Sequence, residues 1–133
     1  MEYFKDFENW NELKKKIDST DHKPPYFNEG DVWWTYVGIN IGFEEDGKKP
    51  LFLRPVLVVK KFNPFLFIGI SMSTKLKNIQ YYRPIKIKDK KVSVIISQIR
   101  SYSSKRLLNK LSEMEKKDFR DITNKVRKYF PSL

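Results

Sequence analysis

Apolar positions in the middle of the chain recur at the two-residue spacing of β-strands, in short runs separated by turn-forming residues. The segment RPIKIK at 83–88 alternates isoleucine with charged residues, whereas FLRPVLVVKKFN at 52–63 contains a continuous apolar, β-branched run. Strands are expected at 31–39, 52–63, 64–73, 83–88 and 92–97, with a further short one in RLLNKL at 106–111. Short strands in succession predict a small, strongly curved antiparallel barrel.

The apolar spacing changes to three and four residues at both ends of the chain, which predicts a helix at each end. The N-terminal helix is expected at about 3–18, with an apolar stripe of Phe4, Phe7, Trp10, Leu13 and Ile17. The C-terminal helix is expected to open with a capping box of Ser112 and Glu115. It should then bury Phe119, Ile122, Val126 and Phe130.

A linker separates the N-terminal helix from the strands. The segment DHKPPYFNEG at 21–30 contains two adjacent prolines, which exclude regular structure, and a glycine that permits a turn. We therefore expect residues 1–27 to form a helix and linker packed on a domain at 28–133, within one globular unit overall.

The balance of charge narrows the choice of partner. The 133-residue chain carries 27 lysines and arginines against 16 acidic residues, a net charge of +11, and seven of the basic residues lie within 75–91. Such a surface favours polyanions, with nucleic acid first and acidic protein segments or anionic lipid after it. The absence of cysteine excludes disulfides and thiolate metal sites, so a reducing cytoplasm is the expected location. The apolar runs are too short to span a bilayer, and no membrane association is expected.

Several kinds of catalytic site lack the residues that they need. His22 is the one histidine, so a metal cluster, a two-histidine ribonuclease site and a Ser-His-Asp triad are unsupported, and no metal or cofactor is expected. The groups that remain are arginine, hydroxyl, amide and lysine, which suit a phosphodiester because cations and donors stabilise charge that builds on phosphate. RNA supplies its own nucleophile, the 2′-hydroxyl, so a site of this composition favours RNA chemistry.

Arg54 is the unusual residue of the apolar run at 52–63, where it stands directly before Pro55. A buried, unpaired guanidinium would be very costly. Arg54 is therefore expected either at the mouth of the strand, facing an anionic ligand, or in a structural pair with a loop carboxylate such as Glu44. Similar alternatives stay open for Ser73, as an exposed strand-end hydroxyl, and for Gln98, as a residue that holds the chain through backbone hydrogen bonds.

The order of the motifs EGDVWWTYVG, LRPVLVV, SMSTK and ISQIRSYSSKRLLNKL resembles that of the PemK/MazF toxins of type II toxin–antitoxin systems, over about residues 28–130. Each motif is short, but together, in this order and spacing, they make a specific signal. The resemblance implies an SH3-like antiparallel barrel (PemK/MazF/CcdB-like) that forms a homodimer. It also implies metal-independent, sequence-specific cleavage of single-stranded RNA that leaves a 2′,3′-cyclic phosphate.

The resemblance also implies roles for individual residues. Arg54 matches the catalytic arginine and Ser73 the catalytic hydroxyl, with Thr74, one place on, as the alternative. Gln98 and Glu44 match positions that contact RNA in the family, and Thr74, if it is not the catalytic hydroxyl, is expected to contact RNA as well. Lys75 and Lys77, which follow the hydroxyl directly, are expected to bind backbone phosphates. The sequence departs from many relatives at Ser97, where they have an acidic residue, and in its longer loop at 40–50.

The expected function is that of an endoribonuclease toxin, restrained by a cognate antitoxin whose acidic segment lies in the RNA groove. Two other functions stay open. One is a catalytically silent SH3-like module that binds nucleic acid or protein, and the other is an enzyme inhibitor like the gyrase-poisoning toxins built on the same barrel.

Overall fold

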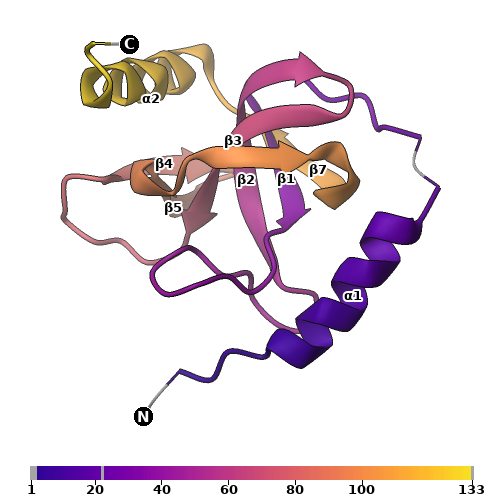
Figure 1. Ribbon diagram of the computed structural model, residues 1–133. Helices are drawn as coiled ribbons and strands as arrows, with labels where there is room; N and C mark the ends of the chain where they lie inside the picture. The colour runs from indigo at the N-terminus through magenta and orange to yellow at the C-terminus, as the bar shows by residue number, and fades with distance from the viewer. Residues whose placement is uncertain (1–2, 22, 133) are drawn as a thin grey trace.

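The computed structural model describes residues 3–21 and 23–132 and consists of a curved antiparallel sheet with a helix at each end of the chain (Figure 1). The two helices are α1 (Phe7–Ser19) and α2 (Lys116–Tyr129). The strands are β1 (Asp31–Tyr36), β2 (Leu53–Asn63), β3 (Leu66–Ser73), β4 (Tyr82–Ile87), β5 (Lys90–Ile95), β6 (Arg100–Ser103) and β7 (Leu107–Glu113). Short 3-10 turns occupy Ile96–Gln98 and Ser104–Arg106.

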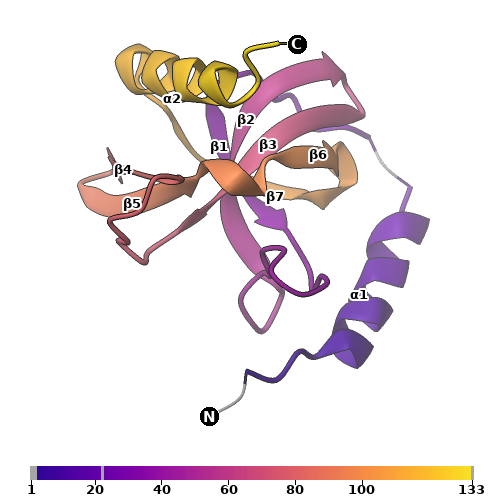
Figure 2. The same ribbon diagram turned by 60° about the vertical axis from the view of Figure 1, so that its left-hand side comes forward.

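The sheet has the strand order β4-β5-β3-β2-β1-β7, and β6 pairs with β3. Strand β3 divides its pairing, because Leu66–Gly69 lie beside β6 whereas Met72 and Ser73 lie beside β5. This division and the register shifts in β2 curl the sheet without closing it, since its hydrogen-bonded path ends at β4 and β7 (Figure 2). The predicted barrel-like antiparallel fold is confirmed.

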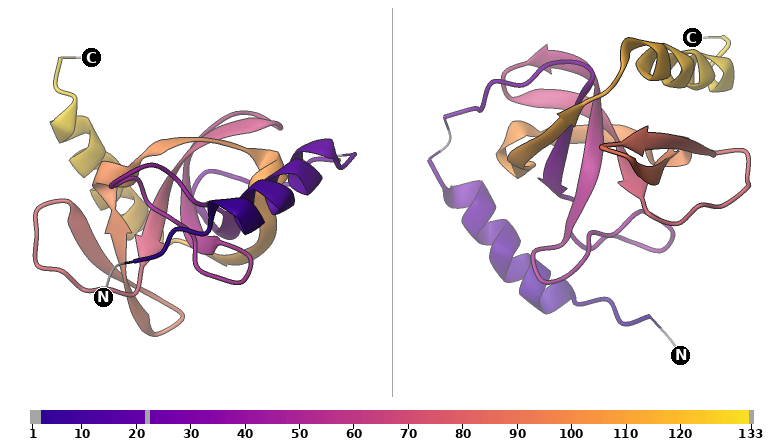
Figure 3. Two further views of the ribbon diagram at one scale, coloured as in Figure 1. Left: turned by 60° about the horizontal axis from the view of Figure 1, so that its bottom comes forward. Right: turned by 180° about the vertical axis from the view of Figure 1, so that it is seen from behind.

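Three apolar clusters hold the elements together. The rings of Phe27, Phe67 and Tyr102 pack together in one cluster with side chains of β1 and β2, and Phe67 and Tyr102 are stacked. Ile122 anchors α2 over a second cluster formed by β2, β3, β4 and β5. Trp10 anchors α1 against Ile39 and Phe52. The helices therefore cover opposite sides of the barrel, as the views in Figure 3 also show.

All six predicted strands are confirmed with shifted ends, the run RLLNKL belonging to β7, whereas β6 was not predicted. The predicted capping box is wrong. Ser112 and Glu113 pair with β1 as the end of β7, so the helix begins at Lys116, and its N-cap Glu115 makes no side-chain capping bond. Phe130 is exposed rather than buried, because it follows the last turn of α2.

The N-terminal helix also begins later than predicted. The carboxylate of Asp6 accepts a hydrogen bond from the Asn9 amide at 3.1 Å and caps α1, so Phe4 precedes the helix. Phe4 and Phe7 are exposed, while Trp10 is buried. Among the described residues, no helix is long and apolar enough to cross a membrane.

A glycine makes the close packing of α1 possible. Gly38 has a φ of +81° and lies against Trp10, whose ring a Cβ at this position would overlap. Gly30 has a similar φ of +90°, with open space around it. The two positions therefore separate backbone strain from steric overlap.

We expect Gly30→Ala to lower the free energy of unfolding by about 1 kcal/mol, the cost of a left-handed conformation for an L-residue. Gly38→Ala should lower it by about 3 kcal/mol, because the displaced Trp10 ring adds an overpacking cost. Urea unfolding of both variants measures the difference. Equal losses for the two variants would mean that the Trp10 contact contributes little to stability.

Candidate active site

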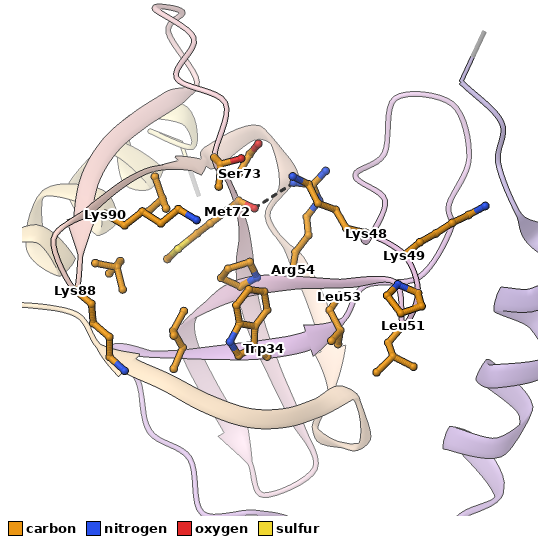
Figure 4. A pocket seen from close by; sticks show the side chains of 16 residues that line it. Trp34, Lys48, Lys49, Leu51, Leu53, Arg54, Met72, Ser73, Lys88 and Lys90 are labelled. Atoms are coloured by element: carbon orange, nitrogen blue, oxygen red, sulfur yellow. Dashed lines mark hydrogen bonds between the residues drawn. The ribbon is translucent and has the colours of Figure 1, made fainter. Parts of the chain in front are cut away.

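The ends of two neighbouring strands bring an arginine and a serine together. Strands β2 and β3 are antiparallel, with Val56 opposite Ser71. Arg54 lies two residues before Val56 and Ser73 lies two residues after Ser71, so both residues lie at the same end of the strand pair. Figure 4 shows both side chains at the same edge of the sheet, above the apolar wall that includes Trp34. The predicted catalytic pair is therefore adjacent in space.

The guanidinium of Arg54 is held from three directions and has 13% of its side chain exposed. Its Nε donates to the carbonyl of Asp46 and its Nη1 to the carbonyl of Met72 at 3.4 Å. Its Nη2 lies 2.7 Å from Oε1 of Glu45 in an ion pair. Arginine has five N–H donors, so, among the described residues, these contacts leave one donor on each terminal nitrogen for a ligand.

The loop that carries the carboxylates is fixed by its own hydrogen bonds and by Gln98. The amide of Asn40 donates to Oδ1 of Asp46 at 2.6 Å, which closes the loop on itself. Oε1 of Gln98 accepts from the Glu45 amide at 2.9 Å, and its Nε2 donates to the Phe43 carbonyl at 2.9 Å. The loop at 40–50 is thus tied to the 3-10 turn that follows β5.

Burial has a clear electrostatic effect at Glu45. Removal of its carboxyl from water raises its pKa above the ordinary 4.5, and the positive charges of Arg54 and Lys75 only partly oppose this rise. A carboxylate with a raised pKa accepts a proton more readily than an ordinary one. The paired guanidinium and carboxylate therefore combine an electrophilic and a basic group.

Ser73 is the better placed of the two candidate hydroxyls. Its side chain is buried, and Oγ accepts the Lys75 amide at 3.1 Å, so its own O–H is directed elsewhere. Ser73 lines two hollows that meet at Arg54: a groove of about 750 Å³ and a mainly apolar one of about 520 Å³. Thr74 is exposed and borders the mainly apolar hollow but not the groove of about 750 Å³.

The groove of about 750 Å³ is basic and open at the surface. Its lysines are Lys5, Lys48, Lys49, Lys75 and Lys77. Gln98 and Glu44 also line it, so each predicted RNA-binding residue except Thr74 borders this groove. The arrangement can hold an extended polyanion across Arg54 and Ser73.

The partner of Arg54 differs from the one anticipated. Glu45, not Glu44, makes the ion pair, while Glu44 is exposed and accepts a hydrogen bond from the Ile41 amide at 3.2 Å. Both the oxygen and the nitrogen of the Gln98 side-chain amide bind the loop backbone, which is the structural role considered for this residue.

Sequence reasoning also missed Asp46 and Lys5. Asp46 is buried and forms an ion pair with Lys5, whose Nζ lies 3.3 Å from Oδ2. The run of three acidic residues in FEEDG was the available signal. His22 lies outside the described residues. Within the described parts of the chain, no group of three or more His, Asp and Glu side chains is arranged to hold a metal ion.

Comparison with known proteins gives a family and a fold. The family described as PemK-like, MazF-like toxin of type II toxin–antitoxin systems matches residues 28–130. No curated protein matches the sequence. MazF (Form-I) from Deinococcus radiodurans aligns with a TM-score of 0.69 at 18% identity, covering 80% of this chain and 99% of that one. A MazE–MazF structure (Form-II) from the same organism aligns with a TM-score of 0.64 at 16% identity, covering 83% and 98%. At these identities the structural likeness establishes a shared fold.

The geometry predicts that Gln98 holds the Glu45 backbone in place. Gln98→Ala should speed hydrogen exchange of the Glu45 amide about fivefold, the effect of losing one hydrogen bond of ordinary strength. Gln80→Ala serves as the control, because the exposed Gln80 side chain lies outside the loop. NMR exchange rates measure the effect. Equal rates in both variants would show that the hydrogen bonds within the loop keep its conformation without Gln98.

Proposed function

The chain belongs to the PemK-like, MazF-like toxins of type II toxin–antitoxin systems, and we propose that it cleaves single-stranded RNA as a metal-independent endoribonuclease. One observation carries the proposal: Arg54 presents two N–H donors that no other described residue occupies, beside the Ser73 hydroxyl and the Glu45 carboxylate, in a groove lined by lysines. This set can bind a phosphodiester and act on it with protein groups and the RNA itself.

The proposed reaction is in-line attack of a 2′-hydroxyl on the adjacent phosphorus. Glu45 accepts the proton of the 2′-hydroxyl as the new bond from the 2′-oxygen to phosphorus forms. The bond to the 5′-oxygen breaks, and this oxygen takes a proton from water. The products are a 2′,3′-cyclic phosphate and a 5′-hydroxyl.

Arg54 and Ser73 stabilise the charge that grows on the non-bridging oxygens. The planar guanidinium offers paired N–H donors, and the serine O–H adds a third. Because its pKa is so high, arginine is a poor proton acceptor, which leaves the raised-pKa carboxyl of Glu45 as the base.

The remaining groove residues bind and position RNA. Lys75 and Lys77 contact backbone phosphates, and Glu44 and the second amide N–H of Gln98 contact nucleotides near the cut. Thr74 lies on the apolar side of Ser73 and contacts the RNA there. We propose residues 28–133 as the toxin domain, and residues 1–27 as an addition to it.

The protein partners follow from charge and apolar surface. The basic groove fits an acidic antitoxin segment that would compete with RNA, in keeping with the MazE–MazF structures of similar fold. The apolar hollow of about 520 Å³, lined by Trp34, Leu53 and Leu111 among others, offers a surface for a homodimer. The proposed location is the cytoplasm, where RNA is available.

Loss of the Arg54 guanidinium should reduce the rate of cleavage. Arg54→Ala should lower kcat by about a hundredfold or more, the scale of a lost charge-stabilising donor, with a smaller change in RNA affinity because the lysines remain. Arg54→Lys should not rescue activity, because one ammonium cannot reproduce the planar donor pair. Arg120→Ala, on the exposed face of α2, is the control.

The measurement uses a long single-stranded RNA in EDTA, followed by mapping of the cut ends and kinetics on a short RNA that contains one mapped site. Discrete cuts ending in cyclic phosphate support the proposal. RNA that stays intact but bound would indicate a binding module instead. Arg54→Ala cutting at the wild-type rate would place the chemistry elsewhere.

The raised pKa of Glu45 predicts the acidic limb of the pH–rate profile. The base must be deprotonated, so the rate should fall as pH decreases through this pKa, with a midpoint above 4.5. Glu45→Gln should lower kcat by about a hundredfold and remove the limb. Glu12→Gln, an exposed change on α1, should leave the profile unchanged. An intact limb in Glu45→Gln would assign the base to another group.

A further inference from the structure

Tyr3–Asp6, here called the N-terminal arm, runs along the loop at 40–47 before α1 begins (Figure 3). Asp6 caps α1 and also lies 3.5 Å from Nζ of Lys49. The arm therefore has a fixed origin at the helix and a contact with the segment that follows the loop. It precedes the part of the chain that matches the family, which begins at residue 28.

Lys5 attaches the arm to the loop. Its Nζ donates to the carbonyl of Asn40 at 2.8 Å and to the carbonyl of Gly42 at 3.0 Å. It also forms the ion pair with buried Asp46. Three contacts on one ammonium, two of them with backbone, give the arm a defined place at the edge of the catalytic groove.

The arm presents two aromatic side chains to that groove without burying them. Tyr3 is 66% exposed and Phe4 72% exposed, and both line the groove that contains Arg54 and Ser73. Phe43, at the tip of the loop, lines the same groove and is fully exposed. Large apolar side chains gathered in one open groove are typical of a binding surface.

The surroundings of these rings match single-stranded nucleic acid. Aromatic faces stack on bases, and nearby lysines neutralise the phosphates between them. Lys49 lies 5.4 Å from the centre of the Phe4 ring, and Lys77 and Lys75 border the same groove. Aromatic and cationic groups thus line one groove together with Arg54.

We propose that the N-terminal arm forms an RNA-binding subsite, in which Tyr3 and Phe4 stack on unpaired bases beside the cleaved phosphodiester, together with Phe43. The subsite rests on the proposed ribonuclease function and adds a recognition element outside residues 28–130. It contributes to binding and not to the chemical step, because the rings carry no group that the reaction uses.

An acidic peptide suits this end of the groove less well than RNA. Burial and then the charge of Asp46 raise the pKa of the Tyr3 phenol, and the charge of Glu45 contributes too, so the phenol lies within reach of two carboxylates. An acidic side chain placed here would have to compete with Asp46 for Lys5 and with Glu45 for Arg54, because both carboxylates are already paired with these cations. A neutral base would meet only the ring faces, while its phosphates lie toward the lysines.

The test compares aromatic variants of the full chain on RNA with and without the stacked base. Tyr3→Ala, Phe4→Ala and the double variant remove the rings, whereas Tyr3→Phe and Phe4→Trp retain them. Tyr26→Ala is the matched control, since Tyr26 is 82% exposed but lies outside the groove. The substrates are short RNAs around one mapped cut, each with an abasic nucleotide at one flanking position.

We expect an abasic nucleotide at one or two flanking positions to raise the wild-type KM about tenfold, the scale of one lost base–aromatic stack. Each alanine variant should raise KM on intact RNA by a similar factor with kcat unchanged. The double variant should no longer distinguish intact from abasic RNA. Tyr3→Phe, Phe4→Trp and Tyr26→Ala should behave as wild type.

The outcomes separate this inference from the proposed function. Wild-type KM in the double variant, with normal cutting, overturns the subsite alone, and so does a loss of antitoxin binding with KM unchanged. If the wild type cuts no RNA, the proposed function fails, and binding of a fluorescent single-stranded RNA then tests the subsite. In that assay an unchanged Kd in the double variant overturns it, whereas a Kd raised about tenfold supports it.

Discussion

A guanidinium near the start of an apolar strand is stable only where fixed acceptors surround it, and this requirement organises the site around Arg54. The sheet supplies one acceptor, the Met72 carbonyl, and the loop before β2 supplies the others through Glu45 and Asp46. The loop can do so only while its own backbone is held, which Gln98 achieves at the Glu45 amide. One charge that the sheet cannot satisfy alone therefore determines the conformation of the loop and gives the 3-10 turn after β5 its role.

The charged residues in the motifs that carry the family resemblance have different structural roles. In EGDVWW, the carboxylate of Asp31 is buried, accepts hydrogen bonds from the Asn28 amide and the Trp33 indole, and lies 3.4 Å from Nζ of Lys110. It fixes the turn into β1 and the pairing of β1 with β7, far from any substrate chemistry. In LRPVLVV the unusual residue, Arg54, faces a groove instead. In the sequence both are single charged residues within short motifs, but the partners of Asp31 all lie within the fold, whereas Arg54 lines an open groove.

The barrel and both helices could be predicted because hydrophobic periodicity reports which face of an element is buried. The prominence of Arg54 was also predictable, from the cost of burying an unpaired charge. The choice between Glu44 and Glu45 was not, because neighbouring loop residues have no periodicity that says which side chain turns inward. The start of α2 was mispredicted for a related reason: Ser112 satisfies the capping spacing, but pairing with β1 offers its backbone a full ladder of hydrogen bonds.

The loop is held from two sides by residues remote from each other in the sequence, Gln98 and Lys5. Lys5 binds mainly through backbone carbonyls, of Asn40 and Gly42, so its hold depends little on the side chains that the loop presents. A substitution of the Phe43 side chain at the loop tip should then leave the Glu45–Arg54 pair in place, because Gln98 binds the backbone carbonyl of Phe43. In the proposed reaction, the strands place Arg54 and Ser73 at the phosphate and the loop adds Glu45, while the loop tip and the arm would contact the bases. On this proposal, the aromatic rings of the added N-terminal segment can alter recognition of the bases while Arg54, Ser73 and Glu45 keep their places.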